Sequence, residues 1–302
     1  MNDTIFFGNG LNNLSKKPIP WNELLNRIKG KKIFDNGELP NTFIYERAVF
    51  ENKTSNDIRQ TEFNIKLSIA DLLIKIETNE FYQMLFELNA ENYLTTNYDY
   101  AFRNYITNVE KYFSSNNSTE DIYSIRRQTQ ILDKNEKEIC KIWNIHGEID
   151  KPISIMLGLD HYCGSVSKLD AYIKGTYEFQ ENSKQIRITK MTDKLKTKDF
   201  DNRSWSELFF NSNIHILGFS LDYSETDIWW LLTKRARILN EEKSSNLISN
   251  NIYFYDRNIK ADKEELLKSL NVTVIKPKED NYKDNWHQYY TDTIKKIKNK
   301  IK

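Results

Sequence analysis

Short apolar runs alternate with amphipathic segments along most of this chain. Runs rich in β-branched and aromatic residues predict strands, and apolar residues at helical spacing predict helices. Their regular alternation predicts an α/β fold with a doubly wound, mostly parallel, Rossmann-like sheet. The predicted strands cover 4–7, 93–94, 142–145, 214–217, 251–256 and 272–275, and the predicted helices cover 21–28, 62–88 with a break near 78–79, 100–105, 228–232 and 263–270.

Less regular segments separate these units. We expect irregular structure over 33–60, where Pro40 and a polar stretch interrupt the pattern. Residues 114–119 are serine- and asparagine-rich and predict a polar surface loop. Two extended segments, 123–132 and 139–145, flank a polar turn and predict a hairpin.

The domain organisation follows from the same pattern. We predict a single domain over 1–302, with its core at about 4–162 and 205–276. Residues 163–204 are rich in Lys, Asp, Thr and Ser and predict a small insertion or cap over the sheet. Residues 280–302 predict a basic amphipathic helix. A docked terminal helix with a solvated lysine face is favoured there over a membrane or acidic-partner contact.

A polar cluster, Thr95-Thr96-Asn97-Tyr98-Asp99, follows the short apolar piece at 93–94. In α/β proteins, the loops at the carboxyl ends of strands carry the ligand chemistry. The cluster therefore predicts a binding or catalytic loop. A β-turn closed by an Asx hydrogen bond is the structural alternative.

Two further strand ends carry glycine. Gly8-Asn9-Gly10 separates the first strand from a helix, an arrangement that can bring backbone amides close to a phosphate. The third glycine of the usual dinucleotide fingerprint is missing, so a tight strand-to-helix turn is the alternative. Leu217-Gly218-Phe219-Ser220 ends a later strand, and acidic residues follow it. Together these loops predict a nucleotide in the crevice at the switch point of the sheet.

His146 ends the strand 142–145 and precedes Gly147. Histidine titrates near neutral pH, so this position suits a general base, although a capped core histidine is the alternative. We place His161 at a loop or helix start near the site. His215 lies in an apolar run and is assigned to structure, and His287 lies in the terminal helix without a predicted role. No two histidines have the spacing of metal ligands.

Composition narrows the function classes. The 302 residues carry a net charge of +1, so no global field attracts nucleic acid or an anionic membrane. Two cysteines supply neither a disulfide framework nor a four-cysteine zinc site, which fits a reducing, cytoplasmic setting. The sequence shows no signal-peptide pattern and no apolar run of the ~20 residues that a membrane span needs.

Taken in chain order, Gly8–Leu11, Thr95–Asp99, Ile145–Gly147 and Leu217–Ser220 resemble the sirtuin fold. The likeness covers about residues 4–275 and is closest to the sirtuin-like, NAD-degrading domains of bacterial anti-phage defence systems. It implies NAD phosphates over the first glycine loop and adenosine beside the last one. The NAD-binding residues that it implies are Gly8, Asn9, Gly10, Leu11, Thr96, Tyr98, Gly218, Phe219 and Ser220, with Asp222 and Asp256 as further candidates for ribose or adenine contacts.

Departures from the protein-deacylating sirtuins narrow the expected reaction. Asn9 and Thr96 replace the alanine and glutamine of those enzymes, and only Cys163 follows His146, so a four-cysteine zinc ribbon cannot form. This argues against deacylation and leaves cleavage of the nicotinamide–ribose bond, for which no metal is required. Asn97 would hold a water and a ribose hydroxyl, and His146 would take the proton. Asp99 would orient the loop or stabilise the developing cation.

We therefore expect an NAD glycohydrolase that acts as a toxic effector of anti-phage defence. Such an enzyme would be kept latent by homo-oligomerisation or by a companion sensor or regulator protein, without direct contact to nucleic acid or membrane. A catalytically idle subunit that binds NAD or ADP-ribose is the alternative, and a deacylase or ADP-ribosyltransferase is less favoured. Glu148 and Asp150 either assist catalysis or are solvated loop residues.

Overall fold

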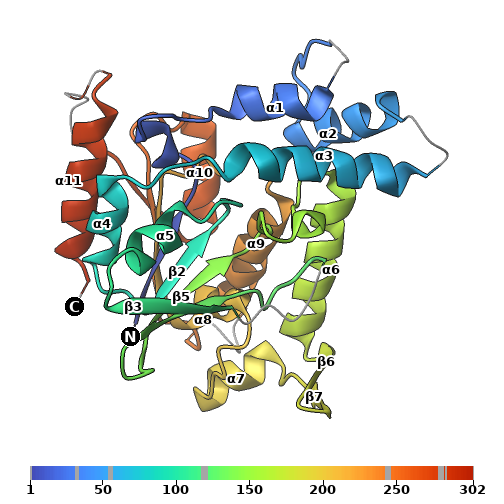
Figure 1. The fold of residues 1–302 in the computed structure, drawn as a ribbon. Coiled ribbons are helices and arrows are strands. Elements are labelled where there is room, and N and C mark those ends of the chain that lie inside the picture. Colours follow the sequence, from blue (N-terminus) through green and yellow to red (C-terminus); the bar gives the residue numbers. More distant parts are fainter. Residues whose placement is uncertain are drawn as a thin grey trace.

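An eight-stranded sheet forms the centre of the molecule, with helices on both of its faces (Figure 1). The computed structural model describes residues 2–30, 34–53, 57–116, 122–241, 246–277, 282 and 284–301. Strands β10 to β5 run parallel, and β4 and β3 add an antiparallel edge, so the predicted mostly parallel α/β sheet is confirmed. The order across the sheet is β10 (Val272–Ile275), β9 (Ile252–Tyr255), β8 (Asn213–Leu217), β1 (Asp3–Phe7), β2 (Asn92–Thr95), β5 (Glu138–Asn144), β4 (Thr129–Asp133) and β3 (Tyr112–Asn116).

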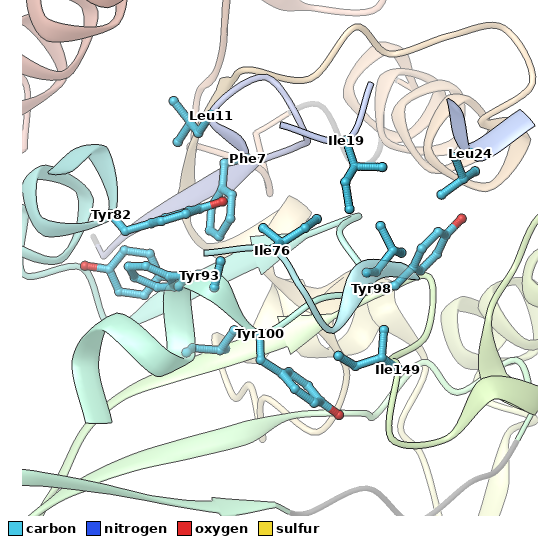
Figure 2. Packing of buried hydrophobic residues seen from close by; sticks show 14 of the residues in the cluster. Phe7, Leu11, Ile19, Leu24, Ile76, Tyr82, Tyr93, Tyr98, Tyr100 and Ile149 are labelled. Atoms are coloured by element: carbon cyan, nitrogen blue, oxygen red, sulfur yellow. The ribbon is translucent and has the colours of Figure 1, made fainter. Parts of the chain in front are cut away.

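Two hydrophobic cores lie on opposite faces of this sheet. Successive side chains of a strand point to opposite faces. Accordingly, Ile5 and Phe7 belong to the first core and Phe6 to the second. Figure 2 shows aromatic side chains of the first core, where Phe7 packs against Tyr82 with ring centroids 6.0 Å apart.

The helices divide between the two cores according to their buried residues. The first core is covered by α1 (Trp21–Lys29), α2 (Asn41–Glu51), α3 (Ile58–Leu73), α4 (Glu80–Phe86), α5 (Ala101–Thr107) and α11 (Trp286–Lys298). The second is covered by α6 (Leu159–Lys174), α7 (Met191–Thr197), α8 (Leu208–Asn211), α9 (Thr226–Asn240) and α10 (Ala261–Ser269).

The two helices predicted over 62–88 are confirmed, but the first begins earlier than predicted. Helix α3 begins at Ile58, where the Asp57 side chain accepts a hydrogen bond from the Arg59 amide. Helix α4 begins after Asn79, whose side chain caps the Phe81 amide. The break expected near 78–79 therefore lies at a helix N-cap.

The prediction of irregular structure over 33–60 is wrong, because α2 occupies residues 41–51. Residues 33 and 54–56 of that stretch lie outside the described residues. Phe43 and Phe50 of α2 are 46% and 67% exposed, while Ile44 and Ala48 are buried. Apolar residues on both sides of the helix blur the amphipathic stripe on which helix prediction rests.

The polar stretch at 114–119 is also corrected. Ser114 to Asn116 form the end of edge strand β3, and 117–119 lie outside the described residues. The strand pairs with β4 through its backbone, which its polar composition does not reveal. The predicted hairpin is confirmed as β4 and β5, although β4 begins at Thr129 rather than 123.

The boundary placed between 162 and 163 falls inside α6. Leu169, Tyr172 and Ile173 of this helix are buried in the second core. Downstream of α6, β6 (Glu178–Glu181) and β7 (Lys184–Arg187) pair as a separate two-stranded sheet. The division into domains stays a prediction.

The terminal helix docks on the molecule through its predicted apolar face. Ile294 and Ile297 of α11 are buried, and Ile301 packs partly buried against the same core. Residues 280, 281, 283 and 302 of the predicted segment lie outside the described residues. Over the described part of the chain, no helix has the length and apolar character needed to cross a membrane.

Candidate active site

Five strands end at the same edge of the sheet. Phe7 lies in register with Thr95 and Leu217, Thr95 with Asn144, and Leu217 with Tyr255. The loops after β1, β2, β5, β8 and β9 therefore emerge side by side. The sheet extends from β1 toward β2 on one side and toward β8 on the other, so its switch point lies between β1 and β8.

The glycines of this edge let two loops touch. The Gly10 amide donates to the Gly218 carbonyl at 2.8 Å, and a Cβ at Gly10 would lie 2.8 Å from the Gly218 Cα. A Cβ at Gly8 would lie 2.9 Å from the Gly218 oxygen. Contact between the loops thus accounts for glycine at these positions before any ligand is considered.

We expect Gly10→Ala to destabilise the fold by about 1–3 kcal/mol, because the added methyl overpacks this contact. The nearest atom would be the Tyr290 hydroxyl, 2.4 Å from the new Cβ. Urea unfolding measures the loss, and Gly10→Ala combined with Tyr290→Phe should recover part of it. An unchanged unfolding midpoint in Gly10→Ala would show that the loops separate easily.

Two adjoining pockets open at this edge. The histidine pocket encloses about 490 Å³, including open solvent, and α1 and α3 cover it through Trp21, Leu24 and Leu73. The aromatic pocket encloses about 1190 Å³, also including open solvent. The two pockets share Asn9, Trp21, Thr96 and Glu225 in their walls.

Most of the residues proposed from the sequence line one or both pockets. Gly8 and Leu11, both within the described part of the chain, line neither, and the Leu11 side chain is fully buried in the first core. Their binding roles, like those of the others, stay predictions. The histidine pocket contains Asn9, Thr96, Asn97, Tyr98, Asp99 and His146, and the aromatic pocket contains Asn9, Gly10, Thr96, Gly218, Phe219, Ser220, Asp222 and Asp256.

The loop after β2 holds Asn97 through its backbone. The Asn97 amide donates to Thr95 Oγ1 at 3.0 Å, and its carbonyl accepts from Asn144 Nδ2 at 3.0 Å. Its side-chain Nδ2 lies 3.5 Å from the Gly8 carbonyl, at the limit of a hydrogen bond. The backbone is therefore fixed, and the buried carboxamide, which also bonds the Tyr82 side chain, lies in the wall of the histidine pocket.

From the sequence, Asp99 would either orient its loop or stabilise the developing cation. Its contacts in the structure favour the first role. Oδ2 accepts from Asn12 Nδ2 at 2.8 Å, and Oδ1 accepts from the Ala101 amide at 2.9 Å. Asn12 also donates to Asn9 Oδ1 at 2.9 Å, so its bond to Asp99 ties the segment after β1 to the loop after β2. Burial raises the pKa of Asp99.

His146 lies between two carboxylates at the end of β5. Its Nε2 lies 3.1 Å from Asp227 Oδ2, and its Nδ1 lies 3.4 Å from Glu225 Oε2. The ring meets Tyr162 edge-on, with centroids 5.3 Å apart. His146 is only 1% exposed yet lines the histidine pocket, so it combines a buried ring with access to a ligand.

Gly147 permits the chain to leave this position sharply. Its φ is +106°, and a Cβ there would lie 2.3 Å from the Ser154 carbonyl oxygen. Glycine adopts such backbone angles without steric cost. The His-Gly pair therefore sets the direction in which the imidazole points.

The two carboxylates control the charge of the imidazole. Burial lowers the pKa of His146, but the negative charges of Asp227 and Glu225 outweigh burial, so its pKa lies above the usual value. Burial raises the pKa of Glu225 to about 7 against the opposing effect of His146. Glu225 therefore exchanges protons near neutral pH, beside a histidine that favours its charged form.

Glu225 and Asp227 were not predicted as site residues. In the sequence they appear only among the acidic residues that follow the Gly218 loop. In the structure, Asp227 is fully buried, and its oxygens accept from the Ile228 amide at 2.8 Å and from Ser165 Oγ at 3.2 Å. The available signal was that these acids follow Gly218-Phe219-Ser220 at the same sheet edge as His146.

His146, Glu225 and Asp227 together offer an imidazole and two carboxylates, which are common ligands of divalent metal ions. One atom each of His146, Glu225 and Asp227 lies within 4.8 Å of the others. The Ile228 amide and the Ser165 hydroxyl already use lone pairs of Asp227 that an ion would need. The expectation of a metal-free site stays a prediction.

The other histidines do not line the two described pockets. His161 starts α6, where Nδ1 accepts from the Leu157 and Gly158 amides and Nε2 pairs with Glu62. It therefore lies at a helix start as expected and lines neither described pocket, although the next residue, Tyr162, meets the His146 ring. His215 bonds Asp3 and Tyr255 inside the sheet, as its structural assignment implied.

Glu148 is not a solvated loop residue. It is 1% exposed, pairs with Arg127 at 3.0 Å and accepts from the Tyr100 hydroxyl at 2.9 Å. Asp150, by contrast, is exposed. The buried pair anchors the segment that follows His146.

Arg127→Ala is expected to cost about 3–5 kcal/mol of unfolding free energy, because it leaves the Glu148 carboxylate buried without its positively charged partner. Chemical denaturation measures this loss. The double variant Arg127→Met with Glu148→Leu should be clearly more stable than the single one. Equal losses in the two variants would show that packing, rather than charge, determines the effect.

A family model described as a SIR2-like domain matches residues 91–275. The chain belongs to the SIR2-like domain family. No curated protein is significantly similar to it. The matched segment of the SIR2-like domain carries Asn97, His146 and the loop after β8, whereas the Gly8–Leu11 loop and α11 lie outside it. Membership supports a sirtuin-like, NAD-related function for this site.

Proposed function

We propose that this chain is an NAD glycohydrolase that cleaves the nicotinamide–ribose bond. The observation that carries the proposal is that Asn97 and His146, from loops 49 residues apart in sequence, line one pocket of a SIR2-like domain, where two carboxylates flank the histidine. A polar amide and a general base are the groups that hydrolysis of this bond requires.

The tautomer of His146 follows from its neighbours. An ionised Asp227 can only accept hydrogen bonds, so Nε2, which faces it, carries the hydrogen. Nδ1 is then the nitrogen that accepts a proton, and Glu225 Oε2 lies 3.4 Å from it as the next acceptor. This is the geometry of a base held in position by a buried carboxylate.

The reaction consumes one water. The bond between ribose C1′ and the nicotinamide nitrogen breaks, and nicotinamide leaves as a neutral molecule with the bonding electrons. The water oxygen bonds to C1′, and its proton passes to Nδ1 of His146, then to Glu225 and finally to solvent. The products are ADP-ribose, nicotinamide and a proton. Asn97 holds the water and a ribose hydroxyl in line for this step.

The test is nicotinamide release from NAD by the purified chain. Asn97→Ala should lower turnover by about 10²-fold or more, because the water loses its positioning group. Asn64→Ala removes the same side chain from an exposed position of α3 and should leave turnover unchanged. Equal turnover in Asn97→Ala and the native chain would refute this site.

A catalytically idle NAD- or ADP-ribose-binding subunit is the second candidate. The engaged carboxylate of Asp99 and the buried His146 would also suit binding without turnover. Calorimetry separates the two functions. ADP-ribose binding without nicotinamide release, with the native operon partners present, would favour the idle subunit.

We further propose that the enzyme serves as a toxic effector in bacterial anti-phage defence, by depleting NAD. Such an enzyme must stay inactive until infection, which requires homo-oligomerisation or a companion regulator. Co-purification of the native operon tests this. A chain that remains alone, monomeric and constitutively active would refute the partner.

A further inference from the structure

A helix outside the family match builds one wall of the aromatic pocket. Trp286, Tyr289 and Tyr290 of α11 line this pocket together with Tyr255 at the end of β9. The SIR2-like match ends at residue 275, before α11 begins. In Figure 1, α11 is the red helix that runs beside α4. The family match therefore does not account for this wall.

Helix α11 is held in place by packing against α4 and the first core. Phe81 of α4 meets the Tyr290 ring with centroids 6.1 Å apart and the His287 ring at 4.9 Å. Ile294 and Ile297 are buried in the first core. The aromatic wall is consequently present before a ligand arrives.

The wall combines aromatic rings with carboxylates. Trp286 is 39% exposed, and the buried Tyr289 and Tyr290 lie beside it with centroids 5.8 and 6.1 Å away. The Arg257 guanidinium lies over the Trp286 ring, 4.6 Å from its centroid, so a base that stacks on this face takes the place of Arg257. Asp256 and Asp222 also line the pocket. Aromatic faces stack on nucleobases, and carboxylates accept hydrogen bonds from ribose hydroxyls and amino groups. This combination suits a nucleoside better than an acyl or peptide chain.

The two pockets together fit a dinucleotide. The aromatic pocket joins the histidine pocket through the shared residues Asn9, Thr96 and Glu225. A ligand that places its reacting bond beside His146 would extend past Gly10 and Gly218 toward the wall. We propose that α11 is a substrate-binding element, in which Trp286 stacks on the adenine base. The inference rests on the proposed function for the identity of the dinucleotide.

AMP, which carries the adenine nucleoside without the reacting bond, is the probe. We expect the full chain to bind AMP in calorimetry, and Trp286→Ala to weaken this affinity about 5- to 150-fold. Trp286→Phe should recover much of the binding, because a smaller aromatic face remains. Lys296→Ala is the control, since Lys296 is an exposed residue of α11 that does not line the described pocket.

Thermal unfolding of each variant shows whether it folds. If Trp286→Ala does not fold, Trp286→Phe is used instead, and its AMP affinity should lie below that of the native chain. Two results overturn the inference: no AMP binding by the native chain, or equal AMP affinity in native and Trp286→Ala. A failure of the proposed function alone gives a different result: AMP would still bind through Trp286, but the chain would not cleave NAD. Cleavage of NAD with an unchanged KM in Trp286→Ala would overturn the inference alone.

Discussion

His146→Ala is expected to lower the rate of NAD cleavage by about 10²–10⁴-fold, the range that a positioned general base contributes. The imidazole lies in the histidine pocket with Asn97. Without it, the proton of the attacking water must pass to bulk solvent or to Glu225, whose Oε2 lies 3.4 Å from the lost Nδ1. Steady-state release of nicotinamide, measured at several pH values, gives the size of the loss.

Two controls accompany this variant. Lys296→Ala removes an exposed side chain of α11 that lines neither described pocket, and it should keep native turnover. ADP-ribose binding to His146→Ala, measured by calorimetry, should stay within a few-fold of native, since Asn97 and the aromatic pocket are untouched. Native turnover in His146→Ala would mean that the buried histidine is only a packing residue.

The pH profile of the native enzyme has a definite direction. The base form of His146 is needed, and its pKa lies above the usual value because Asp227 and Glu225 outweigh burial. Turnover should therefore rise with pH through that raised pKa. A rate that falls over the same range would contradict His146 as the base and favour its charged form as an acid.

The central strands could be predicted from the sequence because they are buried on both faces. Such strands appear as short apolar runs, and 4–7 and 93–94 are examples. Helix α2 was missed because Phe43 and Phe50 face solvent and obscure its amphipathic stripe. Strand β3 was missed because an edge strand needs only backbone partners, which serine and asparagine also provide.

Part of the site could also be predicted from the sequence. Polar residues and glycine at strand ends identify loops by local pattern, and parallel strands bring those loops together. Contacts that depend on helix placement leave no local pattern. Asp227 meets His146 across 81 residues because α9 starts directly beside the end of β5. The sequence likewise predicted α11 only as a basic amphipathic helix, and it is the docking of this helix that places Tyr290 beside Gly10.

Asp227→Asn is expected to lower turnover by about 10²–10⁴-fold without removing the imidazole. The carboxylate both keeps the hydrogen on Nε2 and stabilises the imidazolium that forms when Nδ1 takes a proton. An asparagine of the same size provides neither the charge nor a unique acceptor facing Nε2. Because Asp227 acts through His146, it is a positioning residue.

The shift of the pH profile separates this role from simple structural damage. Removing the Asp227 charge leaves burial to lower the pKa of His146, so the acidic limb of the profile should move to lower pH while the maximum rate falls. Glu225→Gln should move the limb in the same direction with a smaller loss of rate, because its oxygen lies 3.4 Å from the ring rather than 3.1 Å. A uniform loss of rate with an unmoved limb would assign Asp227 to the fold, through Ser165 and the Ile228 amide, and not to the proton transfer.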